Sequence, residues 1–176
     1  MNSDLLLYFL NRKELIQMAK AAVRDKLTPE GKKFLAALQS IGDLQVRIGF
    51  QAGEAEHDGV DLCDIAMFNE LGTAHIPSRP FMRDTVDNHQ DEILDYIVKW
   101  SKKCLEGRME THEMMMNIGM LVKGLMQEEI VRGNFVPNAE ATIRQKGSDK
   151  PLIDSGLMRA SVNYQITTKG NGEELK

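Results

Sequence analysis

The chain has 176 residues and a formal net charge of -4, so its length allows one domain with short extensions and leaves little room for a second. Apolar residues make up 42% of the sequence and charged residues 27%, which excludes wholesale disorder. The acidic balance argues against general affinity for nucleic acid, because neutralising phosphates needs an excess of Lys and Arg, although a local basic patch is compatible with it.

The start of the chain predicts helices followed by a strand. Helix-forming residues with apolar side chains at near-helical spacing predict a helix over 4–26. Thr28 precedes a proline, the pattern of an N-cap and first helical position, and predicts a short helix over about 29–38 that ends before Gly42. Apolar and polar side chains then alternate over 44–50, which is typical of a half-buried strand.

The stretch from residue 54 to residue 70 is the most acidic part of the chain, with six carboxylates and no Lys or Arg. Its first part, with Gly53 just before it and Gly59 within it, is predicted to be a loop. Residues 61–71 are predicted to form a short helix with Gly72 at its C-terminal cap. A calcium loop needs alternating oxygen ligands and a closing glutamate, which this order does not supply.

Two long helices are expected next. Pro80 suits the first turn of a helix that reaches about Cys104, and another runs from about Glu110 to Arg132, where Gly133 ends it. A last strand is predicted over 161–168. The expected core-facing positions are Val86, Ile93, Ile97, Trp100 and Cys104 in the first helix and Met114, Ile118, Leu121, Leu125 and Met126 in the second.

The sequence contains no complete catalytic or metal-binding motif, so we expect no catalytic residues, no metal and no cofactor. His112 and Glu113 begin the metallopeptidase pattern H-E-x-x-H, but position 116 is methionine and the second imidazole is missing. Ser155 has no histidine near it in sequence, and turn formation or helix capping explains it better.

Cys63 and Cys104 form no C-x-x-C pair, and we expect both to be buried in a reducing cytoplasm. The apolar run over 5–10 is too short to cross a bilayer and lacks the positive start of a signal peptide, so we expect no membrane contact.

Two loop segments combine turn residues with scattered apolar side chains. They cover 71–81 and 137–147, and the second is followed closely by 151–157. Gly, Pro and polar residues fix the shape of a backbone, whereas apolar side chains need something to cover them. The combination suggests surfaces built for a partner.

Four sequence blocks follow one another along the chain: IAMFNELGT (65–73), IPSRPF (76–81), FVPNA with the later TI and KG pairs (135–147), and KPLIDSGL (150–157). In this order they resemble the tail-completion and head-tail joining proteins of long-tailed bacteriophages, the minor tail-component group. The resemblance covers about 46–166, and the chain before residue 46 and the acidic insert match no pattern of that group.

The resemblance implies a small α+β fold, which with the elements above becomes a small antiparallel or mixed sheet packed against two long helices. The expected organisation is an N-terminal helical extension (1–40), an α+β tail-component domain (41–168) and a flexible tail (169–176).

The resemblance further implies a structural virion protein that completes the phage tail and joins it to the head as part of a ring-shaped neck. The implied partners are other copies of the chain, tail terminator or tail-tube proteins and head connector proteins, with DNA only as passing cargo. The implied location is the virion, after assembly in the host cytoplasm. The alternatives are a head-side connector or an assembly chaperone not retained in the virion, and, less favoured, an enzyme that uses the acidic cluster.

Partner-binding side chains are expected in the proline-containing loops. Phe81, Phe135 and Leu152 are candidate apolar anchors, and Arg79 and Lys146 are candidates for charge-assisted contacts to a partner carboxylate. The alternative is that Phe81 and Leu152 cover the chain's own core and that Arg79 caps a local helix end. The expected partner-binding set is Ile76, Pro77, Arg79, Pro80, Phe81, Phe135, Pro137, Asn138, Thr142, Lys146, Pro151, Leu152, Asp154 and Leu157.

The acidic stretch is expected to face the channel of the ring or its mouth, because carboxylates there repel the DNA backbone and keep the passage from binding it. The expected channel-facing residues are Glu54, Glu56, Asp58, Asp61 and Asp64.

Overall fold

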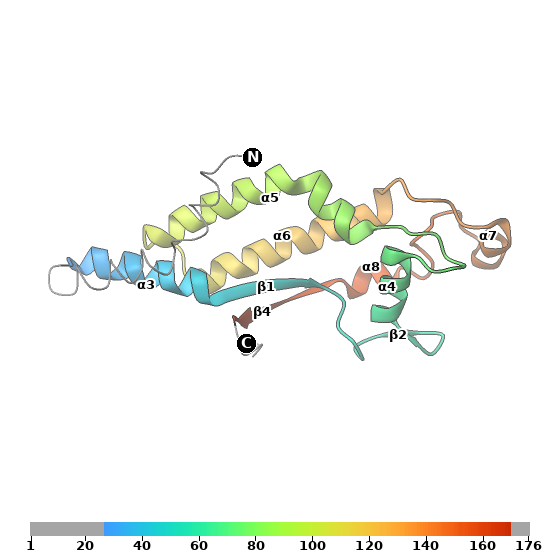
Figure 1. The fold of residues 1–176 in the computed structure, drawn as a ribbon, viewed down its shortest axis with the longest axis horizontal. Coiled ribbons are helices and arrows are strands. Elements are labelled where there is room, and N and C mark those ends of the chain that lie inside the picture. The colour runs from blue at the N-terminus through green and yellow to red at the C-terminus, as the bar shows by residue number, and fades with distance from the viewer. Residues whose placement is uncertain (1–26, 170–176) are drawn as a thin grey trace.

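The computed structural model describes residues 27–169 of the chain. The helix expected over 4–26 and the tail beyond residue 169 lie outside the described residues. The described part is an α+β fold with six helices and two small antiparallel sheets (Figure 1). The helices are α3 (Pro29–Asp43), α4 (Leu62–Leu71), α5 (Phe81–Leu105), α6 (Thr111–Arg132), α7 (Glu140–Lys146) and α8 (Leu157–Ser161), and the strands are β1 (Leu44–Gly49), β2 (Glu56–His57), β3 (Val60–Asp61) and β4 (Asn163–Thr168).

The two long helices, α5 and α6, lie side by side, and α6 packs against both strands of the larger sheet. Figure 1 shows an elongated molecule with α3 at one end and α7 with its neighbouring loops at the other. The predicted layering of a small sheet against two long helices is therefore confirmed, and the sheet is antiparallel.

The larger sheet joins the two predicted strands, which are far apart in the chain. β1 pairs with β4 so that Leu44 lies opposite Thr168 and Val46 lies opposite Ile166. β4 begins at Asn163, two residues later than expected, because the preceding residues form α8.

The buried side chains form two clusters along α6. The first cluster contains Phe81, Leu152 and Val162, and it packs against buried residues of α4 and α6. The other places Cys104 and Ile166 between the long helices and the sheet. Cys104 is buried as predicted, whereas Cys63 is only partly buried.

The predicted core stripes of the long helices are partly wrong. Val86 is 51% exposed, and Phe81 and Thr85 are the buried residues at the start of α5. His89 has non-helical angles (φ -118°, ψ 17°), so the two halves of α5 do not share one helical phase. On α6, which contacts both α5 and the sheet, the burial spreads over more than one stripe: Met115, Gly119 and Val122 are buried, and Ile118 and Leu121 only partly.

The predicted end of the second helix is also wrong. α3 continues through Gly42 to Asp43 and passes directly into β1, with the Leu44 N–H donating to the Ser40 carbonyl. α3 therefore crosses the expected boundary at residue 40, and it packs against α5 and α6. α7 and α8 were not predicted, since helices of seven and five residues are too short to show a periodic pattern.

Two glycines on α6 provide a test of this packing. A Cβ atom added at Gly119 would lie 2.4 Å from Cδ2 of the Tyr164 ring, whereas one added at Gly124 would meet nothing within 4 Å. We expect Gly119→Ala to lower the free energy of unfolding by about 1–3 kcal/mol through overpacking. Gly124→Ala should raise it by about 0.5–1 kcal/mol, because alanine favours the helix. Urea unfolding of both variants, followed by circular dichroism, measures the difference, and equal effects would contradict the described contact of α6 with β4.

Candidate functional site

The loop segments over 71–81 and 137–157 meet at one end of the molecule, to the right in Figure 1. We call this region, residues 72–80 and 133–156, the loop end. It contains α7 and follows the C-terminal ends of α4 and α6. Gly72 begins it with φ +76°, and a Cβ atom there would lie 2.8 Å from the Ser78 nitrogen, so this close turn needs glycine.

Arg79 connects the two halves of the loop end. Its side chain is 6% exposed, and its Nε donates to the Val136 carbonyl at 2.9 Å. Nη1 donates to Asn69 Oδ1 at 3.1 Å, and Nη2 donates to Asn138 Oδ1 at 3.1 Å and to the Pro137 carbonyl at 3.4 Å. Burial lowers the pKa of this guanidinium from its usual value. The expected contact of Arg79 to a partner carboxylate is therefore wrong, because the group binds acceptors of its own chain.

Lys146 has a similar internal role at the end of α7. Its Nζ donates to the Lys150 carbonyl at 3.0 Å and to the Pro151 carbonyl at 3.5 Å, and Asn138 Nδ2 also donates to the Lys150 carbonyl. Burial lowers the pKa of Lys146, and the positive charge of Arg79 acts in the same direction while Asp154 opposes it. Lys146 therefore holds the loop after α7 in place, and its contact to a partner carboxylate stays a prediction.

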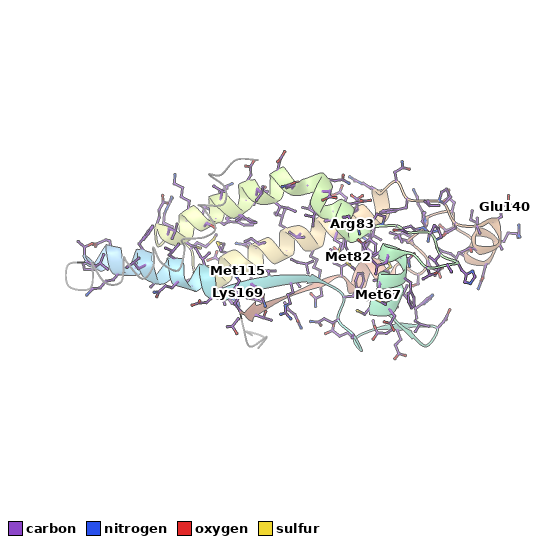
Figure 2. The ribbon with its side chains drawn as sticks, in the orientation of Figure 1. Met67, Met82, Arg83, Met115, Glu140 and Lys169 are labelled. Carbon is purple, nitrogen blue, oxygen red and sulfur yellow. The ribbon has the colours of Figure 1, made fainter. Side chains whose placement is uncertain are left out.

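Glu70 of α4 caps the N-terminus of α5. Its two carboxylate oxygens accept the N–H groups of Met82 at 2.8 Å and Arg83 at 3.2 Å. Figure 2 labels Met82 and Arg83 at this helix start. Pro80 is the N-cap residue and has no side-chain acceptor, so the carboxylate comes from another element. This role of Glu70 was not predicted from the sequence, although a proline at an N-cap indicates that the capping group comes from another element.

The acidic stretch divides into structural and exposed carboxylates. Asp61 caps α4 by accepting the Cys63 N–H at 2.8 Å, and it also accepts the Gly53 N–H at 2.6 Å. Asp61 is partly buried, and both of its carboxylate oxygens bind backbone N–H groups of its own chain. The channel-facing orientation stays a prediction for Asp61 and for the exposed residues Glu54, Glu56, Asp58 and Asp64.

The proposed apolar anchors lie mostly inside the molecule. Phe81 is 0% exposed and Leu152 is 6% exposed, and Phe135 is partly buried against the same cluster. Phe81 and Leu152 are therefore not surface anchors, and the alternative that they cover the chain's own core is the one observed.

The other expected partner-binding residues lie at or near the surface of the loop end. Pro77, Pro137 and Asp154 are exposed. Val136, which the sequence analysis did not single out, is 51% exposed on the loop that Arg79 binds. The partly buried members of the expected set are Ile76, Pro80, Asn138, Thr142, Pro151 and Leu157.

The structure brings His57 close to the segment that contains Ser155. His57 Nε2 lies 3.3 Å from Asp154 Oδ2, which links the β2–β3 hairpin to the loop end. The Ser155 hydroxyl accepts the Leu157 N–H at 3.3 Å, a local turn contact just before α8. Within residues 27–169 no three or more His, Cys, Asp or Glu side chains are grouped to hold a metal ion. In the same part of the chain no helix combines the length and the apolar character needed to cross a membrane.

Comparison with protein-family models, with curated proteins and with solved structures finds no match for this chain.

Proposed function

We propose that the chain is a structural virion protein that completes a phage tail and joins it to the head as part of a ring-shaped neck. The observation that carries this proposal is the internal bracing of the loop end by Arg79, which binds acceptors on α4 and on the loop at 136–138. The family resemblance of these same loops supplies the biological context.

A braced loop suits a joining protein because it loses little conformational entropy when it docks. Ordering a loosely held segment at an interface costs about 0.5–1.5 kcal/mol for each immobilised side chain. In the loop end this ordering is already achieved by hydrogen bonds of Arg79, Asn138 and Lys146. The side chains left outward, Val136 and Pro137 among them, then form a stiff surface for a tail or head protein.

The first experiment removes the gene for this chain from the phage or prophage that carries it and examines the particles by electron microscopy. We expect full-length tails and DNA-filled heads that fail to join. Absent tails would instead support the assembly chaperone, and defective heads would support the head-side connector.

A matched pair of variants tests the surface itself. Val136→Asp places a charge on the exposed loop end and should abolish joining when supplied in place of the natural chain, because a buried unpaired charge weakens an interface. Val98→Asp, on α5 and 67% exposed, is the control and should leave joining intact. Equal behaviour of the two variants would contradict the assignment of the loop end.

A further inference from the structure

The most exposed apolar residues of α4 lie beside an open groove. Met67 is 45% exposed and Leu71 is 64% exposed. Both line a groove of about 850 Å³ between α4 and the adjoining ends of β1 and β4, together with Phe50, Met82 and Glu54. Figure 2 labels Met67 on α4 and Met82 at the start of α5. We call this region the α4 groove.

Carboxylates outnumber cations around the α4 groove. Residues 54–70 contain six carboxylates and no Lys or Arg. Glu54 and Glu70 line the groove together with one cation, Arg47. Asp64 lies one turn before Met67 on α4, at the spacing that places side chains on one helix face. An apolar groove with carboxylates beside it fits an apolar segment that carries cations.

The segment before the described residues has this composition. Residues 1–26 contain an apolar run over 5–10, followed by an excess of basic residues. Five cations stand against three carboxylates, a net charge of +2: Arg12, Lys13, Lys20, Arg24 and Lys26 against Asp4, Glu14 and Asp25. Leu6, Phe9 and Leu10 have the i, i+3, i+4 spacing of anchors that enter a groove as one helix face.

We propose that residues 1–26 of one copy of the chain dock into the α4 groove of another copy. The inference rests on the proposed function in one respect, because a ring-shaped neck needs each copy of the chain to bind the next copy. The contact joins two different surfaces, so it is heterologous and is able to close into a ring.

Chain length favours a second copy over the same copy. α3 and β1 follow one another in line, and the described chain begins at the end of α3 that points away from α4 (Figure 1). The 15 residues of α3 and the 6 of β1 put about 40 Å between residue 27 and the groove, at ~1.5 Å per helical and ~3.3 Å per strand residue. The sequence pattern predicts a helix over 4–26, and such a helix spans only about 26 Å from residue 10 to residue 27. The apolar residues at its start therefore do not reach the groove of their own copy.

The test measures the mass of the purified full chain over a range of concentrations by light scattering. We call residues 1–26 the arm. We expect the natural chain to associate. The arm variant Leu6→Glu/Leu10→Glu and the groove variant Leu71→Glu should both remain monomeric. Val98→Glu, an equally exposed apolar site on α5, is the matched control and should associate like the natural chain. Circular dichroism checks that each variant is folded.

Mixing the two defective variants gives the decisive result. The arm variant retains an intact groove and the groove variant retains an intact arm, so a 1:1 mixture should form a heterodimer and stop there. Association of the groove variant on its own would overturn the proposal in favour of contacts between arms. A natural chain that stays monomeric at every concentration, or a mixture that stays monomeric, would overturn it as well.

Charge reversal gives an independent readout. Glu54→Lys/Asp64→Lys should weaken association at least tenfold and reverse its salt dependence, because salt then screens a repulsion between the lysines and the basic residues of the neighbouring copy. Unchanged affinity would show that the carboxylates do not face the arm. In the proposed arrangement Glu54 and Asp64 meet cations of the neighbouring copy, so this result also tests their predicted orientation toward a DNA channel.

The association measurements do not depend on the phage experiment. Arm-and-groove association with normal joining after loss of the gene would refute the proposed function alone. If joining fails without the gene, but the Leu71→Glu variant associates as strongly as the natural chain, this inference alone would be refuted.

Discussion

Replacing Phe81 by alanine is expected to lower the free energy of unfolding by about 3–5 kcal/mol, the usual cost of removing a buried aromatic ring. Phe81 is fully buried and its ring lies edge-on to that of Phe50, with centroids 6.0 Å apart. Its cluster also contains Leu152 and Met126, so the cavity left by the truncation would be lined from α6 and from the loop end. Chemical denaturation followed by circular dichroism measures the change.

Phe68→Ala is the matched control, since Phe68 is 38% exposed on α4. We expect its effect on unfolding to stay below about 1 kcal/mol, as for most surface substitutions. Equal costs for the two variants would contradict the burial of Phe81 and would restore it as a candidate anchor for a partner.

Replacing Arg79 by alanine is expected to lower the free energy of unfolding by about 3 kcal/mol, because several acceptors lose a charged donor inside the protein. The affected acceptors are two backbone carbonyls of the 136–138 loop and the side-chain oxygens of Asn69 and Asn138. Arg79→Lys should recover less than half of the loss, since an ammonium group lacks the planar fork that reaches all four.

Arg83→Ala is the control for Arg79→Ala, because Arg83 lies four residues further along the chain and is exposed. We expect a change below about 0.5 kcal/mol in chemical denaturation. Limited proteolysis gives a second readout: the Arg79→Ala chain should be cut faster within 133–156 than the natural chain. Unchanged cutting together with unchanged stability would refute the bracing role on which the proposed function depends.

Most elements of the described fold could be predicted from local patterns. The alternation over 44–50, the Thr28 cap and the Gly72 and Gly133 helix ends each depend on residues within a few positions of one another. The predicted core positions of α5 were less accurate, because the irregular turn at His89 changes the helical phase and leaves no local mark in the sequence. The short helices α7 and α8 were missed for a similar reason, since neither spans enough turns to show a period.

The candidate site was predictable in its location and not in its contacts. The unusual loops did mark the loop end, but the sequence left open whether Phe81 belongs to the core, and it did not predict the acceptors of Arg79 and Lys146 within the chain. The acceptors of Arg79 on the 136–138 loop lie 57 to 59 residues further along the chain. Glu70 likewise caps a helix that begins after an intervening loop. No periodic pattern connects such positions.

The amino-acid sequence by itself determined most of the longer α and β segments, the helix ends at Thr28, Gly72 and Gly133, and the contrast between basic residues 1–26 and the acidic stretch 54–70, because propensity, capping and charge depend on neighbouring residues. The tertiary structure alone decided that β1 pairs with β4, that Phe81 is core and that Arg79 braces the loop end. The physical reason is that burial and buried hydrogen bonds arise only when distant segments exclude water together, and the free energy of that step belongs to the whole packed chain.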